Sequence, residues 1–150
     1  MAMMPSQTVC VAGTLDGIRA ATDACDRFLA AHDLDRETGW PVQVALDEIL
    51  ANIVGHAYKG RSDGVIEMTF ALTGSMLVVT IADDGPAVDP LALPTPDVGA
   101  PLQDRRPGGL GIHLVKQLMH RVEYSRKDDR NCLVLMRQLP GQAPDEPGKG

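Results

Sequence analysis

The residues best suited to chemistry begin with a carboxylate and a carboxamide four positions apart, Glu48 and Asn52. Apolar residues recur around them at helical spacing, so a helix would place both polar side chains on one face, one turn apart. A carboxylate there can take a proton from an attacking hydroxyl group or water, and an amide oxygen can bind Mg²⁺. For this spacing alone, two solvent-exposed side chains on an amphipathic helix are the commoner outcome. The rest of the chain must decide between these interpretations.

A second polar group follows a run of β-forming residues, where Asp83, Asp84 and Gly85 stand in sequence. The carboxylate of Asp83, at the end of a strand, can accept a hydrogen bond from the N6 amino group of an adenine. Gly85 has no β-carbon, so the base can come close to the backbone. An Asp-Gly pair is also common in turns at strand ends, and that alternative stays open.

Glycines introduce the last helical pattern of the chain: Gly108, Gly109 and Gly111, with Leu110 among them. Free backbone N–H groups and the positive end of the helix dipole can hold a phosphate at such a helix start. Glycine at a helix start costs about 0.5 to 1 kcal/mol relative to alanine, and close approach of a ligand would justify that cost. A flexible hinge is the alternative. The spacing differs from a Walker A loop, which needs Gly-Lys-Ser or Gly-Lys-Thr.

Two arginines, Arg105 and Arg106, come shortly before these glycines. Either guanidinium group can contact the β- or γ-phosphate of a nucleotide and favour closure of its segment. A solvated surface pair is an equally good interpretation.

In this order, the three blocks resemble the N, G1 and G2 boxes of the GHKL (histidine-kinase-like) ATPase superfamily, which includes gyrase, MutL and histidine kinases. Residues 47–58 and 84–90 most resemble its anti-sigma-factor serine/threonine kinases. The resemblance implies a Bergerat-type ATP-binding fold that uses ATP and Mg²⁺. It implies that Glu48 is the catalytic base and that Asn52 binds the metal and the nucleotide. The other expected nucleotide contacts are Asp83, Gly85, Gly108, Gly109, Leu110 and Gly111, with Arg105 and Arg106 as further candidates.

Two positions depart from the resembled pattern. The longer form of the superfamily motif has a second glycine two residues after Gly85, where this chain has Ala87. Related ATPases often have a threonine in the last strand that supports the adenine through water. The nearest candidates here, Cys132 and Val134, cannot replace it well, and whether Asn131 compensates stays open.

The resemblance also implies a function and partners. It predicts a serine/threonine protein kinase that phosphorylates a serine on an anti-anti-sigma (STAS-like) protein, sequesters a sigma factor and works as a homodimer. The rival hypothesis is a catalytically weak, ATP-gated interaction module with a non-sigma target, in which ATP orders a lid and so exposes or hides a protein surface. Glu48 favours the kinase because a pure binder needs no base.

Hydrophobic periodicity locates the elements that must position these residues. Helices are expected over 14–31, over about 38–54 with Thr38 before the first turn and Pro41 within it, and from the glycines onward. The expected strands are 8–12, 65–72, 76–82, 122–126 and 132–139.

The expected fold class is an α/β (α+β) two-layer sandwich: a mixed, mostly antiparallel sheet with helices packed on one face. The expected domain spans 1–139, with a lid at about 84–108 that is rich in proline. Residues 140–150 have no apolar anchor and are expected to be a disordered tail.

Composition restricts the partners. The formal charge of −6 and a pI near 5.0 argue against direct binding of nucleic acid, which needs clustered lysine and arginine. Cys10, Cys25 and Cys132 are isolated thiols, which fits a reducing cytoplasm. No segment approaches the ~18 apolar residues of a membrane span, so no membrane partner is expected.

Overall fold

The strands form one sheet, and alternate residues along its inner strands are buried on the face that the helices cover. The computed structural model describes residues 5–57, 63–92 and 109–139. Within them the strands are β1 (Ser6–Ala12), β2 (Val65–Thr73), β3 (Met76–Asp83), β4 (Arg121–Lys127) and β5 (Arg130–Gln138). The sheet order is β1-β2-β3-β5-β4, and every pairing among these strands is antiparallel. The sheet was expected to be mixed and mostly antiparallel; its antiparallel character is confirmed, and no pairing among the described strands is parallel.

Tight turns join the strands that are neighbours in the sequence. Gly74, between β2 and β3, has a φ of 61°, which glycine adopts without strain. Asp128 and Asp129, between β4 and β5, have φ values of 53° and 59°, a conformation that aspartate tolerates better than most residues. Both turns lie between strands that the sequence predicted.

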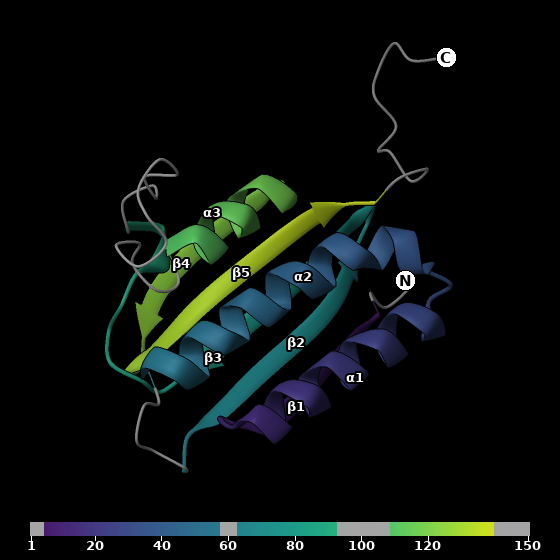
Figure 1. The fold of residues 1–150 in the computed structure, drawn as a ribbon. Helices are drawn as coiled ribbons and strands as arrows, with labels where there is room; N and C mark the ends of the chain where they lie inside the picture. Colours follow the sequence, from purple (N-terminus) through teal and green to yellow (C-terminus); the bar gives the residue numbers. More distant parts are fainter. Residues whose placement is uncertain (1–4, 58–62, 93–108, 140–150) are drawn as a thin grey trace.

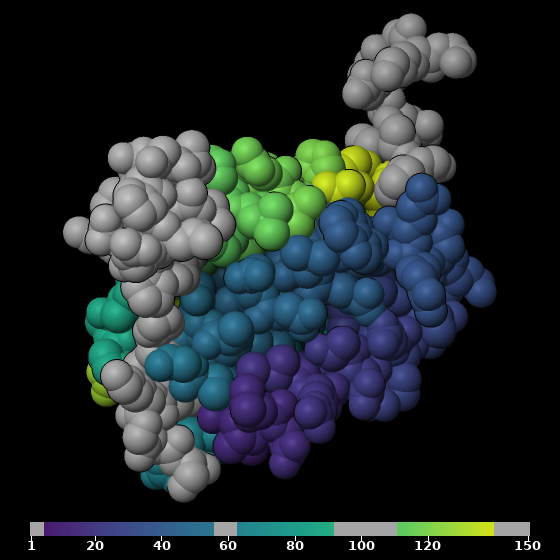
Figure 2. All heavy atoms as spheres, in the orientation of Figure 1, coloured from purple at the N-terminus to yellow at the C-terminus, as the bar shows by residue number. Residues whose placement is uncertain are grey.

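Helices α1 (Leu15–Ala31), α2 (Arg36–Asn52) and α3 (Gly109–Leu118) all cover the same face of the sheet (Figure 1). In the space-filling view of this face they lie side by side and hide most of the strands (Figure 2). The hydroxyl group of Thr14 caps α1 by accepting from the N–H of Gly17 at 3.1 Å. The two-layer sandwich is confirmed.

The start of α2 corrects one expectation. The helix begins at Arg36 and is capped by Asp35, whose Oδ1 accepts from the N–H of Thr38 at 2.7 Å. Thr38 is therefore the donor in this cap, and Pro41 lies inside the helix instead of in its first turn. The bond lost at Pro41 is the donation that a residue there would make to the carbonyl of Glu37. Burial of the proline ring compensates for this loss.

The cap is also electrostatic. Hydrogen bonds from the side chain and the N–H of Thr38 lower the pKa of the Asp35 carboxyl group. Because the folded-state pKa is lowered, this stabilisation is present above the ordinary carboxyl pKa and is lost as the pH falls through the lowered value.

A single apolar core fills the space between the two layers. The sheet contributes alternate residues such as Ile66, Met68 and Phe70, and the helices contribute Phe28 and Leu46, all 2% exposed or less. Phe28 belongs to this core, whereas Trp40 is 56% exposed and lies outside it. The core holds α2 and α3 against the sheet, and these are the helices that carry the candidate site.

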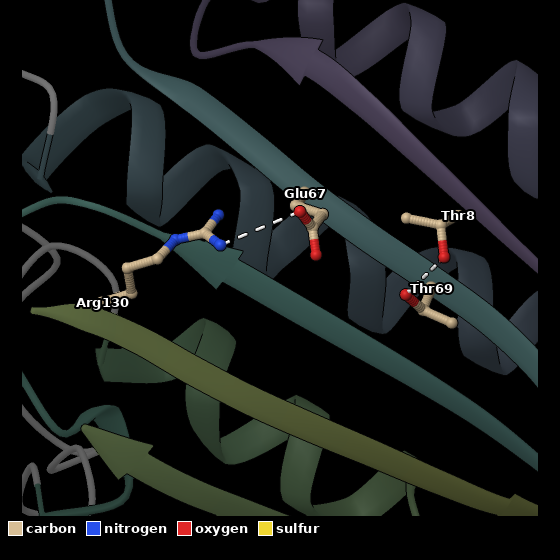
Figure 3. A network of polar contacts seen from close by, with 4 residues as sticks. All are labelled: Thr8, Glu67, Thr69 and Arg130. Atoms are coloured by element: carbon tan, nitrogen blue, oxygen red, sulfur yellow. Dashed lines mark hydrogen bonds and ion pairs between the residues drawn. The ribbon is translucent and has the colours of Figure 1, made fainter. Parts of the chain in front are cut away.

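Polar side chains of β1, β2 and β5 lie on the face of the sheet opposite α1, α2 and α3 (Figure 3). Thr8 and Thr69 share a hydrogen bond of 3.0 Å between their hydroxyl groups, and Arg130 lies 3.8 Å from a carboxylate oxygen of Glu67. No helix within the described ranges is long and apolar enough to cross a membrane. The expected tail, 140–150, and most of the expected lid, 93–108, lie outside the described residues.

Candidate nucleotide site

The candidate residues that the structure describes gather at one end of the sheet. Figure 1 shows the C-terminal end of α2, the start of α3 and the start of β5 at this end. β3 also ends there, because Asp83 is paired with Asn131 at the start of β5. The three sequence blocks, far apart along the chain, thus meet in the fold. Arg105, Arg106 and Gly108 lie outside the described residues, so their positions stay predictions.

Glu48 lies directly against the first turn of α3. A β-carbon added to Gly111 would stand 3.2 Å from Cδ of Glu48 and closer still to its Oε2. The absence of a side chain at Gly111 therefore makes room for the Glu48 carboxylate. Glu48 itself is half-buried, which leaves part of its surface open to a ligand. This contact joins the first sequence block to the third.

Gly109, Leu110 and Gly111 form the beginning of α3, as expected. The first residues of a helix have N–H groups without partners inside the helix, and these can bind an anion. The Glu48 carboxylate lies beside this turn, where a β-carbon of Gly111 would stand. A carboxylate next to a turn that can bind an anion suits proton abstraction close to a phosphate.

Asn52 is the last residue of α2 and is half-buried. The chain then changes to a π-helical turn, Ile53–Ala57, a rare conformation that often occurs at functional sites. The described residues contain no group of three or more acidic, histidine or cysteine side chains that could hold a metal. Mg²⁺ often takes only one or two protein ligands when phosphate oxygens complete its shell, so one amide oxygen from Asn52 fits that mode.

Asp83 is 5% exposed and points to the covered face of the sheet. Its Oδ1 accepts two hydrogen bonds, from the N–H of Gly85 at 2.9 Å and from Nδ2 of Asn131 at 3.0 Å. The bond from Gly85, two residues further on, makes an Asx turn of the kind that aspartate side chains commonly form. Both bonds end on Oδ1, so Oδ2 takes part in neither. The turn and a base-binding role are therefore compatible, one on each oxygen.

The sequence did not decide whether Asn131 supports the base. In the structure its side chain makes hydrogen bonds to several residues around the candidate site. It is 7% exposed, and its amide bonds to Asp83 and to the chain after it. The signal in the sequence was slight: an uncharged polar residue directly before the hydrophobic run 132–136. Tyr124 and Arg126 of β4, which also bond to Asn131, were not predicted as part of the site.

The chain after β3 is hydrogen-bonded to β4 and to α3. The guanidinium group of Arg126 donates to the carbonyl of Gly85 at 2.8 Å. Further along, Lys116 of α3 donates from Nζ to the carbonyl of Leu91 at 3.2 Å. We call residues 84–92 the lid stem, because they begin the expected lid. The lid stem is thus tied both to β4 and to α3.

Comparison with known proteins agrees with this arrangement. The sequence matches the model of the histidine kinase-like ATPase domain over residues 11–137. The chain belongs to this family. The expected resemblance to the small serine/threonine kinases of the superfamily is confirmed by its relatives, which are protein kinases by name.

Serine/threonine-protein kinase BtrW of Bordetella bronchiseptica is 32% identical over 128 residues, which cover 81% of this chain and 90% of that protein. Serine-protein kinase RsbW of Listeria monocytogenes is 33% identical over 86 residues, 55% of either chain. This chain thus spans about half the length of the Listeria relative.

A crystal structure of the RsbU and RsbW domains of a Mycobacterium tuberculosis protein superposes with a TM-score of 0.66 at 17% identity, over 92% of this chain and 33% of that one. At this identity the likeness shows the fold alone, and the fold it shows is the expected one.

Proposed function

We propose that the chain is an ATP-dependent serine/threonine protein kinase of the anti-sigma-factor type. The observation that carries the proposal is the contact between the Glu48 carboxylate and Gly111 in the first turn of α3. It sets a candidate proton acceptor beside a candidate phosphate site. The names of the relatives support the reaction class, since they are called serine- or serine/threonine-protein kinases.

Each candidate residue has a role in the proposed reaction. Glu48 takes the proton of the substrate serine as its hydroxyl oxygen bonds to the γ-phosphorus and the bond to the β–γ bridging oxygen breaks. Asn52 would hold Mg²⁺ through its amide oxygen, and the metal would neutralise charge on the phosphates. Asp83 accepts a hydrogen bond from the adenine amino group, and the N–H groups at the start of α3 hold phosphate oxygens. The side chains of Arg105 and Arg106 are proposed to contact the β- or γ-phosphate.

The partners rest on the resemblance. We propose that the phosphate acceptor is a serine of an anti-anti-sigma (STAS-like) protein, that the chain also sequesters a sigma factor, and that it acts as a homodimer in the cytoplasm. A kinase with a non-sigma target would use the same site. Neither nucleic acid nor membrane is needed for this role.

The first test is calorimetric titration of the wild-type chain and Asn52→Ala with Mg-ATP. We expect binding that depends on magnesium and that Asn52→Ala weakens by about tenfold, as for loss of one bond to a charged group. Asn52→Asp is the matched control, because it keeps an oxygen for the metal and should retain magnesium-dependent binding. Absence of binding at millimolar nucleotide would remove the ATP site from the proposal.

The second test separates a kinase from an ATP-gated interaction module. Transfer of labelled γ-phosphate to a STAS-like protein is measured for the wild-type chain, for Glu48→Ala and for Asp47→Ala. Asp47 is the exposed neighbouring carboxylate, which accepts from the Thr22 hydroxyl at 3.0 Å. We expect Glu48→Ala to bind ATP without transfer and Asp47→Ala to keep transfer. Intact transfer by Glu48→Ala would exclude Glu48 as the base, and ATP binding without any wild-type transfer would favour the interaction module.

A further inference from the structure

We propose that Asn131 is a positioning residue that makes the site select adenine over guanine, by occupying one oxygen of the Asp83 carboxylate. The inference rests on the proposed ATP site and deepens it. The relevant contact is the 3.0 Å hydrogen bond from Nδ2 of Asn131 to Oδ1 of Asp83. Both side chains are nearly fully buried, at 7% and 5% exposed, so water is a poor substitute for this bond.

The orientation of the Asn131 amide is determined by groups on both of its sides. Its Oδ1 accepts from the hydroxyl group of Tyr124 at 2.6 Å, from the guanidinium group of Arg126 at 3.2 Å and from the N–H of Val88 at 3.4 Å. A reversed amide would bring its NH₂ group against the guanidinium and N–H donors. The carbonyl oxygen of Asn131 therefore faces β4, and its NH₂ group faces the other way.

The NH₂ group of Asn131 bridges the carboxylate and the lid stem. Besides Oδ1 of Asp83, it donates to the carbonyl of Pro86 at 2.9 Å. Gly85 donates its N–H to the same Oδ1 at 2.9 Å. Two donors thus converge on Oδ1, and the carboxylate cannot rotate without breaking both bonds. One amide holds the base-recognising carboxylate and the first residues of the lid stem together.

A carboxylate held in this way has one oxygen, Oδ2, to offer to a base. Adenine presents a single exocyclic amino group next to a ring acceptor, so one oxygen is sufficient. Guanine presents N1–H and N2–H₂ side by side, and pairing both requires two acceptor oxygens. The second donor of guanine would then be buried without a partner, which is strongly disfavoured. With Asn131 removed, Oδ1 loses one of its two donors and can turn toward guanine.

The test compares affinities for Mg-ATP and Mg-GTP by calorimetry in the wild-type chain, Asn131→Leu, Asn131→Asp and Tyr124→Phe. Asn131→Leu removes the amide at similar volume. Asn131→Asp keeps the acceptor for Tyr124 and Arg126 but replaces the NH₂ donor, so it decides the question if the leucine variant does not fold. Tyr124→Phe is the matched control, since it removes a bond to Asn131 and leaves the bond to Asp83 in place.

We expect the wild-type chain to prefer ATP by at least about tenfold, and both Asn131 variants to lose about tenfold in ATP affinity with a smaller loss for GTP. The ratio of the two affinities is the decisive quantity, because general loosening of the fold would weaken both nucleotides alike. Tyr124→Phe should keep the wild-type ratio. An unchanged ratio in the Asn131 variants, or equal wild-type affinities, overturns the role of Asn131 while the ATP site stands. Absence of wild-type ATP binding removes the proposed function and this inference together.

Discussion

At the scale of single residues, Gly111 is important because it has no side chain. The Glu48 carboxylate occupies the space in which a β-carbon of residue 111 would stand. Because that carboxylate is the end of a flexible side chain, it can move away from an added methyl group at little cost in stability. The position of the carboxylate is what the proposed chemistry requires, and misplacement of a catalytic group by about 1 Å can cost about 10²-fold in rate.

We therefore expect Gly111→Ala to lower phosphoryl transfer by about tenfold or more. Its stability should stay within about 1 kcal/mol of wild type, since alanine also favours the helix. Gly55→Ala is the control, because a β-carbon there meets no other atom within 4 Å. Rates are measured by labelled phosphate transfer and stability by urea unfolding. A fully active Gly111→Ala would mean that the observed position of Glu48 is unimportant for the reaction.

At the scale of elements, glycines set how closely the helices approach their neighbours. A β-carbon at Gly17 in α1 would overlap the carbonyl oxygen of Ala12 in β1 and lie 2.7 Å from its carbonyl carbon. A β-carbon at Gly39 in α2 would instead overlap Cδ1, at the far end of the Leu29 side chain, and lie 3.5 Å from its Cγ. Backbone cannot yield without moving the strand or the helix, whereas a leucine side chain can adjust.

Gly17→Ala should consequently lower the free energy of unfolding by about 2 kcal/mol or more, after the gain in helix propensity is allowed for. Gly39→Ala should change it by less than about 1 kcal/mol. Urea unfolding of both variants and of the wild-type chain provides the comparison. Equal losses in the two variants would contradict the difference between backbone and side-chain contacts.

At the scale of the whole molecule, the reactivity of Cys25 measures how often the core opens to solvent. Its side chain is 1% exposed, and burial, aided by the charges of Asp26 and Asp47, raises the pKa of its thiol to about 12. Cys10 is exposed on β1. Because the folded-state pKa of Cys25 is raised, this group stabilises the fold fully below its ordinary pKa and progressively less as the pH rises above it.

At pH 8, iodoacetamide should therefore label Cys10 directly and Cys25 only through opening of the core. Mass spectrometry of the labelled chain distinguishes the two sites, and Cys10→Ser confirms the assignment of the fast one. The Cys25 rate should rise with urea in parallel with global unfolding. Labelling of Cys25 at the rate of Cys10 without denaturant would contradict a closed core.

Much of the fold could be predicted because local patterns carry it. Alternating apolar residues and runs of β-forming residues located the strands, and helical spacing located α1 and the segment with Glu48 and Asn52. The predicted start of α2 was wrong because Asp35 and Thr38 are both residues that can cap a helix. Which of them does so depends on which side chain reaches a free N–H group. The contact of Glu48 with Gly111 was not predicted, since it depends on how α2 and α3 pack.

The sequence by itself determined which residue types are present, in which order, and which face of each element is apolar. These follow from side-chain size, charge and local periodicity. Only the tertiary structure decided that β5, and not β4, pairs with β3, and so that Asn131 lies opposite Asp83. A hydrophobic pattern specifies the buried face of a strand but does not name its neighbour. That choice is made by packing between distant segments, and in this chain it sets the surroundings of the carboxylate proposed to bind the base.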